Sequence, residues 1–268
     1  MRDLDGRKAL VTGSATGLGR SIAVMLAERG ADVIVNCTRS ISDAEETIAL
    51  CNGHGAQTQL VTADVSTDEG CAKLAEAAGR WGHLDILVNN AGITRHARHH
   101  SDLDALSRED FLDTYAVNVA GPFLIMQACK ALLIKAHETT GRASAVLNVS
   151  SIAGVTGIGS SVAYAATKGA LNTMTLSLAR ALAPAIRVNA ISPGFIGTRW
   201  FKDEMNADSF ARLEKGVAKS VPLNVASGPD DVAASAVFFL TDASRHITGE
   251  ILLVDAGMHL GYAPLAAR

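Results

Sequence analysis

The sequence has little net charge, no long apolar run and no closely spaced cysteines, and each absence excludes a class of protein. A formal charge of -3 and a pI near 6.2 exclude the basic balance of a nucleic-acid-binding protein. No uninterrupted apolar run approaches the roughly 18 residues that cross a bilayer. The opening stretch, MRDLDGRKALVTG, lacks the apolar segment of a signal peptide. We therefore expect neither nucleic acid nor a membrane as a partner.

The chain also lacks the spacing patterns of common metal and hydrolase sites. Its four cysteines are scattered without a C-x-x-C pair, so we expect no zinc site and no disulfide framework, and we infer a reducing, cytoplasmic setting. Three neighbouring histidines have no carboxylate or cysteine pattern around them, so we interpret them as a solvated loop and expect no metal. The absence of G-x-S-x-G excludes a hydrolase nucleophile turn. The residues concerned are Cys37, Cys51, Cys71 and Cys129, and His96, His99 and His100.

What the sequence does contain is a regular alternation of short apolar runs with longer helical patterns. Apolar residues make up 48% of the chain, and this alternation predicts an α/β fold with a parallel sheet covered on both faces. No linker, repeat or low-complexity segment interrupts it, so we predict one domain over residues 1–268. The expected strands are 8–11, 31–37, 57–63, 84–88, 145–150, 187–191 and 250–254, and the expected helices are 20–29, 41–52, 67–80, 107–136, 162–182 and 230–240.

The turn after the first expected strand is rich in glycine and predicts a phosphate site. Residues 12–19 read T-G-S-A-T-G-L-G. Glycines let the backbone approach a pyrophosphate, and the start of the following helix offers free N–H groups and a favourable dipole. The spacing G-x-x-x-G-x-G differs from the common G-x-G-x-x-G fingerprint. The alternative is an ordinary glycine-rich turn, and the position after the first strand favours phosphate binding.

Residues 151–168 carry the clearest chemistry in the chain. They combine a serine, a tyrosine thirteen positions later and a lysine four beyond it. In a helix, Tyr164 and Lys168 fall one turn apart on the same face. An ammonium beside a phenol lowers the pKa of the phenol from about 10, so we expect Tyr164 to exchange a proton near neutral pH, as carbonyl reduction or alcohol oxidation requires. The Ser151 hydroxyl would polarise the same oxygen, with Ser150 as the rival serine.

Taken with motifs elsewhere, these residues place the chain beside a known family. In its motifs and their order, from about residue 8 to 257, the chain resembles the compact, single-domain branch of the short-chain dehydrogenase/reductase family. The resemblance implies a Rossmann-type, doubly wound sheet of seven parallel strands in the order 3-2-1-4-5-6-7. The matching residues are TGSATGLG, Asp64, Asn89-Asn90-Ala91-Gly92, Asn118, Ser151, Tyr164, Lys168, Pro193-Gly194 with Thr198, and the tail from Gly228 to Gly257.

The resemblance also implies roles for individual residues. Tyr164 would be the general acid/base, Lys168 would hold the ribose hydroxyls and tune the tyrosine, and Ser151 would orient the substrate oxygen. Asn118 would hold a water linking Lys168 to solvent, the alternative being a helix-surface amide. Asp64 would bind the adenine amino group, the alternative being a helix cap. The expected cofactor contacts are Gly13, Ser14, Thr16, Gly17, Leu18, Gly19, Arg39, Asp64, Val65, Asn90, Gly92, Tyr164, Lys168, Pro193, Gly194, Ile196 and Thr198.

The end of the second expected strand bears on which dinucleotide is bound. NAD-preferring relatives carry an aspartate there, whereas this chain has Cys37, with Arg39 two residues further on. A carboxylate would repel a 2′-phosphate, and an arginine would hold one. Thr16 argues the other way, because many NADP-dependent relatives place a second basic residue at that position. We predict NADP in preference to NAD, the alternative being that Arg39 is an ordinary surface residue.

Two segments are expected to form the substrate site. The loop ITRHARHHSDLDAL is longer than in many relatives and basic, and residues 195–222, the lid segment, are expected to move over the substrate. A basic rim and an apolar lid predict a substrate with a hydrophobic or ring portion and an anionic or polar tail. The alternative is that the basic residues are solvated and the aromatics pack under the lid. The expected contacts are Ser151, His96, Phe195 and Trp200, with Arg95, Arg98, His99, His100 and Phe201 nearby.

These features predict an NAD(P)-dependent oxidoreductase that moves a hydride between nicotinamide and a ketone or secondary alcohol. Two alternatives stay open, a catalytically silent dinucleotide-binding or sensor protein and a nucleotide-sugar epimerase or dehydratase. The small residues of the helix from Val162, and the apolar helix before it, favour close packing between subunits. In similar proteins these helices pair across subunits, so we expect a homotetramer.

Overall fold

Short, largely buried apolar runs form one parallel sheet in the computed structural model, which describes residues 2–97, 99–202 and 205–261. The seven strands are hydrogen-bonded in the order β3-β2-β1-β4-β5-β6-β7, and every pairing is parallel. The fold class and strand order predicted from the sequence are therefore confirmed. The strands are β1 (Lys8–Val11), β2 (Asp32–Cys37), β3 (Thr58–Thr62), β4 (Ile86–Asn89), β5 (Ser144–Val149), β6 (Ile186–Pro193) and β7 (Ile251–Val254).

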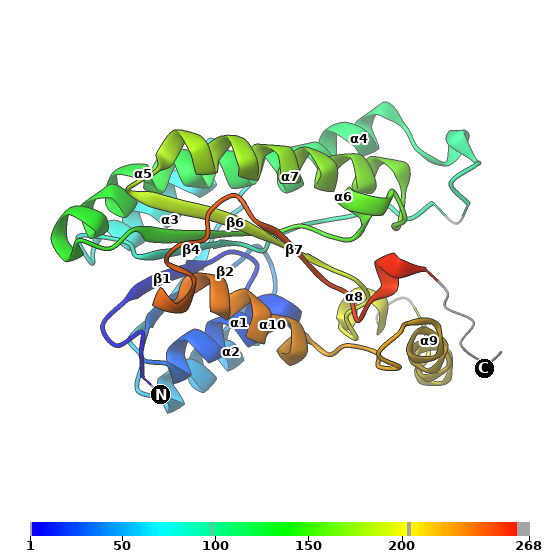
Figure 1. Ribbon diagram of the computed structural model, residues 1–268, viewed down its shortest axis with the longest axis horizontal. Coiled ribbons are helices and arrows are strands. Elements are labelled where there is room, and N and C mark those ends of the chain that lie inside the picture. The colour runs from blue at the N-terminus through cyan, green and yellow to red at the C-terminus, as the bar shows by residue number, and fades with distance from the viewer. Residues whose placement is uncertain (1, 98, 203–204, 262–268) are drawn as a thin grey trace.

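Helices cover both faces of this sheet (Figure 1). One face carries α1 (Gly17–Glu28), α2 (Ile41–Gly53) and α10 (Pro229–Leu240), and the other carries α3 (Asp68–Gly79), α5 (Gly121–Thr140) and α7 (Val162–Leu182). Successive strand side chains point to opposite faces, so Ala9 and Val11 join the hydrophobic cluster on the first face while Leu10 joins the cluster on the second. The sheet thus separates two apolar cores.

The long helix expected over 107–136 is in fact three segments. They are α4 (Arg108–Tyr115), a π-helical turn (Ala116–Ala120) and α5. Pro122, in the first turn of α5, has no N–H to donate to the carbonyl of Asn118 four residues earlier, and a widened turn accommodates the missing bond. Asn118 therefore lies inside the π-helical turn.

By length and composition, the stretch Arg108–Thr140 is apolar enough to cross a membrane. In the fold it is broken by the π-helical turn. One side of it packs on the sheet through the buried side chains of Ile125, Met126, Cys129 and Leu133. The stretch is a core helix of the α/β fold.

Charged residues meet at the amino-terminal ends of the strands. Asp85 is almost fully buried and accepts hydrogen bonds from Lys8 N at 2.9 Å and from Arg7 Nη1 at 3.5 Å. The second guanidinium nitrogen of Arg7 donates to Asp242 at 3.0 Å, and Lys8 Nζ is paired with Asp32. These charged groups neutralise one another at the amino-terminal ends of the strands.

At the opposite edge the chain leaves the sheet and returns. After β6 it forms α8 (Arg199–Lys202) and α9 (Ala207–Ser220), which lie beside the carboxyl ends of the strands (Figure 1). Phe210 is the buried residue of α9, and its ring centroid lies 6.4 Å from that of Phe195. The shorter elements here are α6 (Ala153–Thr156) and two 3-10 turns, Leu103–Ala105 and Met258–Leu260.

Candidate active site

The glycine-rich loop between β1 and α1 is shaped by close approach. Gly13 has φ +60°, and a Cβ there would lie 2.9 Å from Ala91 Cα. A Cβ on Gly19 would lie 2.4 Å from Asn90 Nδ2 and 2.5 Å from Gly13 O. Only glycine fits either position, and the loop leaves the N-terminus of α1 facing the pocket without an acidic residue in its first turn. Its N–H groups suit an anionic ligand.

Two asparagines hold this loop in place. Asn36 Oδ1 accepts a hydrogen bond from Gly13 N at 3.0 Å, and its Nδ2 donates to the carbonyls of Val61 and Ala63. Asn90 Nδ2 donates to Thr12 O and Gly13 O, each at 2.9 Å. Asn36 was missed from the sequence, although one polar residue inside the apolar run of β2 was a usable signal.

Ser14 lies behind the loop, away from the pocket. It is fully buried, its hydroxyl donates to Val11 O at 2.7 Å, and the same oxygen accepts from Asn36 N at 3.0 Å. The Ser14 hydroxyl is therefore used to join the loop to β1 and β2, and a cofactor contact by this side chain is not seen in the described pocket lining.

A pocket of about 1180 Å³ lies at the carboxyl ends of the strands. Ligands bind at this edge of open α/β sheets. The pocket gathers nearly all the residues singled out from the sequence; of those expected to touch cofactor or substrate, only Ser14 does not line it, and Asn118 lies behind it. The lining includes Gly13, Thr16, Gly17, Leu18, Gly19, Arg39, Asp64, Val65, Asn90, Gly92, His96, Ser151, Tyr164, Lys168, Pro193, Gly194, Phe195, Ile196, Thr198 and Trp200.

Tyr164 and Lys168 occupy the first turns of α7. Ser161 caps this helix by accepting from Tyr164 N at 3.1 Å. Lys168 is 4% exposed, its Nζ donates to Val149 O at 2.8 Å, and it lies 5.5 Å from the centroid of the Tyr164 ring. Ser150 Oγ donates to the carbonyl of Lys168 at 3.2 Å, whereas the Ser151 side chain acts on the Tyr164 hydroxyl and opposes the rise in its pKa. The geometry favours Ser151 over Ser150 as the partner of the tyrosine.

The titration of this pair differs from the expectation. Burial raises the pKa of Tyr164 to about 12, and the hydrogen bond with Ser151 opposes this less strongly. Burial also lowers the pKa of Lys168 to about 8. The predicted lowering of the tyrosine pKa by the lysine is therefore contradicted, because desolvation of the phenolate outweighs the influence of an ammonium that is itself buried.

Asn118 is a fully buried residue, so its interpretation as a helix-surface amide is wrong. Its Nδ2 donates to Ile93 O at 2.9 Å and to Thr167 Oγ1 at 3.1 Å, and its Oδ1 accepts from Ile93 N at 2.9 Å. A Cβ on Gly92 would lie 3.3 Å from Asn118 Oδ1 and 3.7 Å from Lys168 Nζ. Asn118 thus ties the loop after β4 to α7.

The far end of the pocket is formed by the loops after β2 and β3. Asp64 Oδ1 accepts from Ser66 N at 2.9 Å and from Ser66 Oγ at 2.7 Å. The helix-cap role considered for Asp64 belongs instead to Thr67, whose Oγ1 accepts from Gly70 N at 3.0 Å. Arg39 is exposed and lines the same pocket as Asp64.

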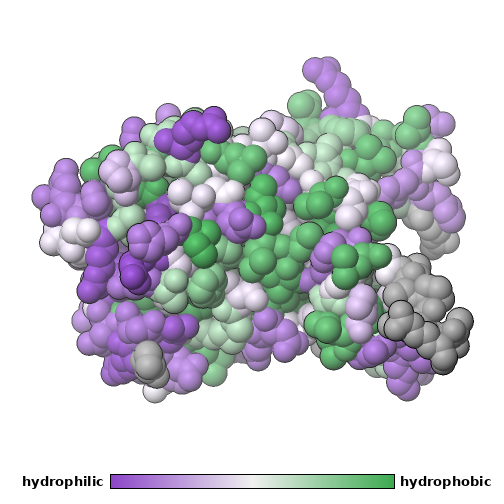
Figure 2. Space-filling model, viewed as in Figure 1, coloured by the Kyte–Doolittle hydropathy of each residue, from purple (hydrophilic) through white to green (hydrophobic). Residues whose placement is uncertain are grey.

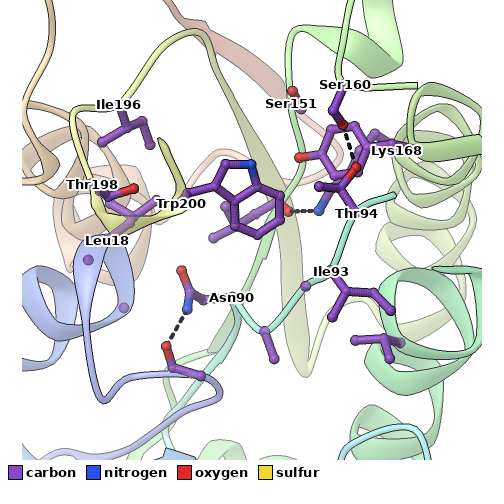
Figure 3. Close-up of a pocket in the computed structure, with 18 of the residues that line it drawn as sticks. Leu18, Asn90, Ile93, Thr94, Ser151, Ser160, Lys168, Ile196, Thr198 and Trp200 are labelled. Carbon is purple, nitrogen blue, oxygen red and sulfur yellow. Dashed lines mark hydrogen bonds between the residues drawn. The ribbon is translucent and has the colours of Figure 1, made fainter. Parts of the chain in front are cut away.

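Figure 3 shows the end of the pocket that holds the proposed catalytic residues. Thr94, Ser151, Ser160 and Lys168 lie on one side, and Leu18, Ile196 and Thr198 lie on the other. The Trp200 ring centroid lies 6.1 Å from that of Tyr164. The hydroxyls of Thr94 and Ser160 are hydrogen-bonded to each other. Neither hydroxyl was singled out from the sequence.

The basic rim expected here is partly neutralised. Arg95 Nε lies 3.1 Å from Asp110 Oδ1, and Arg95 Nη2 lies 3.6 Å from Asp113 Oδ2. His100 Nε2 is hydrogen-bonded to the carbonyl of Gly159 at 2.8 Å. Arg98 and the Phe201 side chain lie outside the described residues.

The lid segment is also tied to the far side of the pocket. Arg199 of α8 forms an ion pair with Asp43 of α2. The same carboxylate lies 3.9 Å from Nη2 of Arg20 in α1. One acidic group therefore joins three helices across the pocket.

The described ranges 2–97, 99–202 and 205–261 contain no group of three His, Cys, Asp or Glu side chains able to hold a metal. The four cysteines are free and buried.

Comparison with known proteins adds independent information. A family model described as enoyl-(acyl carrier protein) reductase matches residues 13–259. A Streptomyces violaceoruber protein named as ketoacyl reductase 2 of the granaticin polyketide synthase is 41% identical over 253 residues, 94% of this chain and 96% of its own. Glucose 1-dehydrogenase 2 of Bacillus subtilis is 35% identical over 262 residues, 97% of each chain. A crystal structure from Burkholderia xenovorans, described as a short-chain dehydrogenase/reductase, matches with a TM-score of 0.86 and 37% identity, over 96% of this chain and 99% of its own.

Proposed function

The chain belongs to the short-chain dehydrogenase/reductase family, and from that premise we propose that it reduces a ketone with Tyr164 as the proton donor. As a member of the family it is an NAD(P)-dependent oxidoreductase acting on alcohols and carbonyls. The observation that carries the proposal is that Ser151, Tyr164 and buried Lys168 line the same pocket as the N-terminus of α1.

The residues of the glycine loop fit a dinucleotide. A pyrophosphate would lie on the backbone at Gly13 and Gly19, where a Cβ has no room, and against the N–H groups of α1. Asp64 and Val65 would contact the adenine, and Lys168 would hold the ribose. The lid-segment residues Ile196 and Thr198 would contact the nicotinamide amide. Nicotinamide, when bound, supplies or accepts the hydride.

The protein's own part in the reaction is to hold and move a proton. Ser151 and Tyr164 would donate to one carbonyl oxygen, which polarises it and delivers the proton from the Tyr164 hydroxyl. A tyrosine pKa of about 12 keeps this hydroxyl protonated at neutral pH. The protonated phenol is the form that donates the proton in carbonyl reduction.

We also propose that the Asn118 side chain holds the loop after β4 in position against α7. Its side-chain amide is already engaged with Ile93 and Thr167. A water linking Lys168 to solvent would therefore bind to the backbone carbonyl of Asn118. That carbonyl lacks the usual helical N–H donor because Pro122 stands four residues further on.

The residues at the adenosine end of the pocket support NADP as the cofactor. Cys37 ends β2 where a ribose-binding carboxylate would stand, and exposed Arg39 follows at the pocket wall. An arginine there would pair with a 2′-phosphate. Comparison of kcat/KM for the two reduced cofactors tests this, and a clear preference for NADH would refute it.

A homotetramer remains our proposal for assembly. Apolar side chains are exposed along the α4, α5 and α7 side, including Phe111, Phe123 and Leu176. Figure 2, drawn in the same view as Figure 1, shows a second apolar area across the middle of the molecule, over the edge strand β7. Exposed apolar area of this kind marks subunit contacts. Light scattering at micromolar concentration tests the assembly, and a monomer would contradict it.

Four buried, unpaired cysteines support a reducing, cytoplasmic setting, which fractionation would test.

The test of function is a ketone screen with both reduced cofactors. We expect turnover of at least one ketone class, loss of turnover in Tyr164→Phe, and retained binding of reduced cofactor measured by its fluorescence. Cofactor binding without any turnover would favour the silent binding protein, and isomerisation of nucleotide sugars would favour the epimerase. A 3-oxoacyl thioester compared with its 2-enoyl counterpart separates carbonyl from double-bond reduction, and Ser151 beside Tyr164 favours the carbonyl.

A further inference from the structure

Two hydroxyl side chains meet at the substrate end of the pocket without a role in the reaction described above. Thr94 belongs to the loop after β4, and Ser160 lies four residues before Tyr164, just before α7. Their hydroxyls are hydrogen-bonded to each other, and both residues are partly exposed in the pocket wall (Figure 3).

This pair lies beside the reacting groups. Gly159, next to Ser160, is so close to the tyrosine that a Cβ on it would lie 3.4 Å from Tyr164 Cδ1. Gly92, two residues before Thr94, lies where a Cβ would be 3.7 Å from Lys168 Nζ. The two loops that carry these hydroxyls therefore lie beside Tyr164 and Lys168.

The pair is not needed to join the two loops. Ala97 N donates to Ser160 O at 2.9 Å, and His100 is hydrogen-bonded to Gly159 O at 2.8 Å. The Asn118 amide fixes Ile93, next to Thr94, through both of its backbone groups. These bonds hold the loops together whether or not the hydroxyls are present.

The hydrogen-bonding capacity of the pair leaves a donor available. Thr94 Oγ1 has one other acceptor, Arg95 O at 3.4 Å, which is long for a hydroxyl bond. Across residues 2–97, 99–202 and 205–261, Thr94 is the one hydrogen-bond partner that the Ser160 hydroxyl has. When Thr94 donates to Ser160, the Ser160 O–H is free to donate into the pocket.

Resting on the proposed function, we propose that Thr94 and Ser160 bind a second carbonyl oxygen of the substrate, while Ser151 and Tyr164 bind the reacting one. The substrate class is a 3-oxo ester or thioester. Two neutral hydroxyls suit a neutral carbonyl rather than a carboxylate, since Arg95, the residue after Thr94, is already paired with Asp110 and Asp113. The same pocket is also lined by the apolar side chains of Ile158, Trp200 and Met258.

The test uses two compounds that differ in one oxygen. Ethyl 3-oxobutanoate carries the second carbonyl, and 4-ethoxybutan-2-one lacks it. The measured quantity is the ratio of kcat/KM for the ester to kcat/KM for the ether, in the wild-type enzyme and in variants. The difference in intrinsic reactivity of the two ketones cancels when variants are compared.

Ser160→Ala should lower this ratio about tenfold, the effect of losing one hydrogen bond that only the ester makes. Thr94→Val, which removes the group that orients Ser160, should lower it about threefold. Ser160→Thr, which keeps a hydroxyl, should restore it to within about twofold. Thr58→Val on β3, outside the pocket, is the matched control and should leave the ratio unchanged.

An active enzyme whose ratio is the same in Ser160→Ala, Thr94→Val and wild type overturns the inference. So does tighter recognition of free 3-oxobutanoate than of its ethyl ester, because a carboxylate is then the preferred group. A wild-type protein that binds cofactor but reduces no ketone of the screen contradicts the proposed function itself, whereas one that reduces other ketones but not ethyl 3-oxobutanoate overturns this inference alone. Thr94→Val carries the test if Ser160→Ala does not fold.

Discussion

The central sheet has an amino edge, where its strands begin, and a carboxyl edge, where they end. These two edges use polar groups in opposite ways. At the amino ends, Arg7, Lys8, Asp32 and Asp85 neutralise one another, and Asp85 is 2% exposed. At the carboxyl ends, helix N–H groups and hydroxyls face a pocket of about 1180 Å³. Charges that satisfy one another stabilise a fold, whereas donors directed into a cavity are available to a ligand. The comparison predicts that substitutions at the two edges change different quantities.

The largest expected effect lies at the carboxyl edge. Tyr164→Phe should lower kcat by about 10²–10⁴-fold, because it removes the proton donor and little else. The dissociation constant of reduced cofactor, from fluorescence titration, should stay within about twofold of wild type, because the ring that packs near Trp200 is kept. Near-normal turnover in this variant would contradict the assignment of Tyr164.

The amino edge should respond in stability and not in chemistry. Asp85→Ala leaves the buried Arg7 guanidinium and Lys8 N without their acceptor, and should lower the free energy of unfolding by about 3 kcal/mol. Urea titration measures the change. The value of kcat per folded molecule should be unchanged, and a parallel loss of kcat would show that the two edges are coupled.

A third difference should appear with pH. Lys168 has a folded-state pKa of about 8, below the unfolded value of about 10.4. Between these values the unfolded chain binds more protons, so stability should rise with pH across this window, by about 2 kcal/mol between pH 8 and 10. Below pH 8 both states are protonated and the contribution is flat.

Urea titrations of wild type and Lys168→Met at several pH values isolate this contribution as the difference between the two proteins. The raised pKa of Tyr164, about 12, acts only above the unfolded value of about 10 and with the opposite sign. A difference that does not change between pH 8 and 10 would mean that Lys168 is not desolvated in the folded protein.

The smallest of the four effects concerns the shape of the glycine loop. Gly19→Ala should weaken cofactor binding about tenfold, because a Cβ 2.5 Å from Gly13 O displaces the loop that faces the pyrophosphate. Gly53→Ala, at the end of α2 with nothing within 4 Å of its Cβ, is the matched control. Equal affinity in Gly19→Ala and Gly53→Ala would show that the loop tolerates the displacement.

The sequence predicted elements well where the signal was local. All seven strands were expected, because each is a short apolar run bounded by glycine, proline or polar residues. The π-helical turn was missed, although Pro122 within an apolar helix was a signal for it. Helix periodicity continues across such a turn, so the pattern alone hides it.

Features of the site that depend on contacts between distant residues could not be predicted. Thr94 and Ser160 are 66 positions apart and meet only because two loops leave neighbouring strands. Pairing of Arg95 with Asp110 and Asp113 was equally hidden, and it weakens the basic rim that charge alone suggested. The pKa of Tyr164 depends on desolvation, which no spacing of residues reports.

The carboxylate of Asp43 has a consequence for the position of α8. It joins Arg199 of the lid segment to α2, but the arginine side chain is 48% exposed. Exposed ion pairs contribute at most about 1 kcal/mol, so this one favours the joined arrangement only about fivefold. The ion pair therefore holds α8 beside α2 only weakly, and the preference falls further as salt screens the charges.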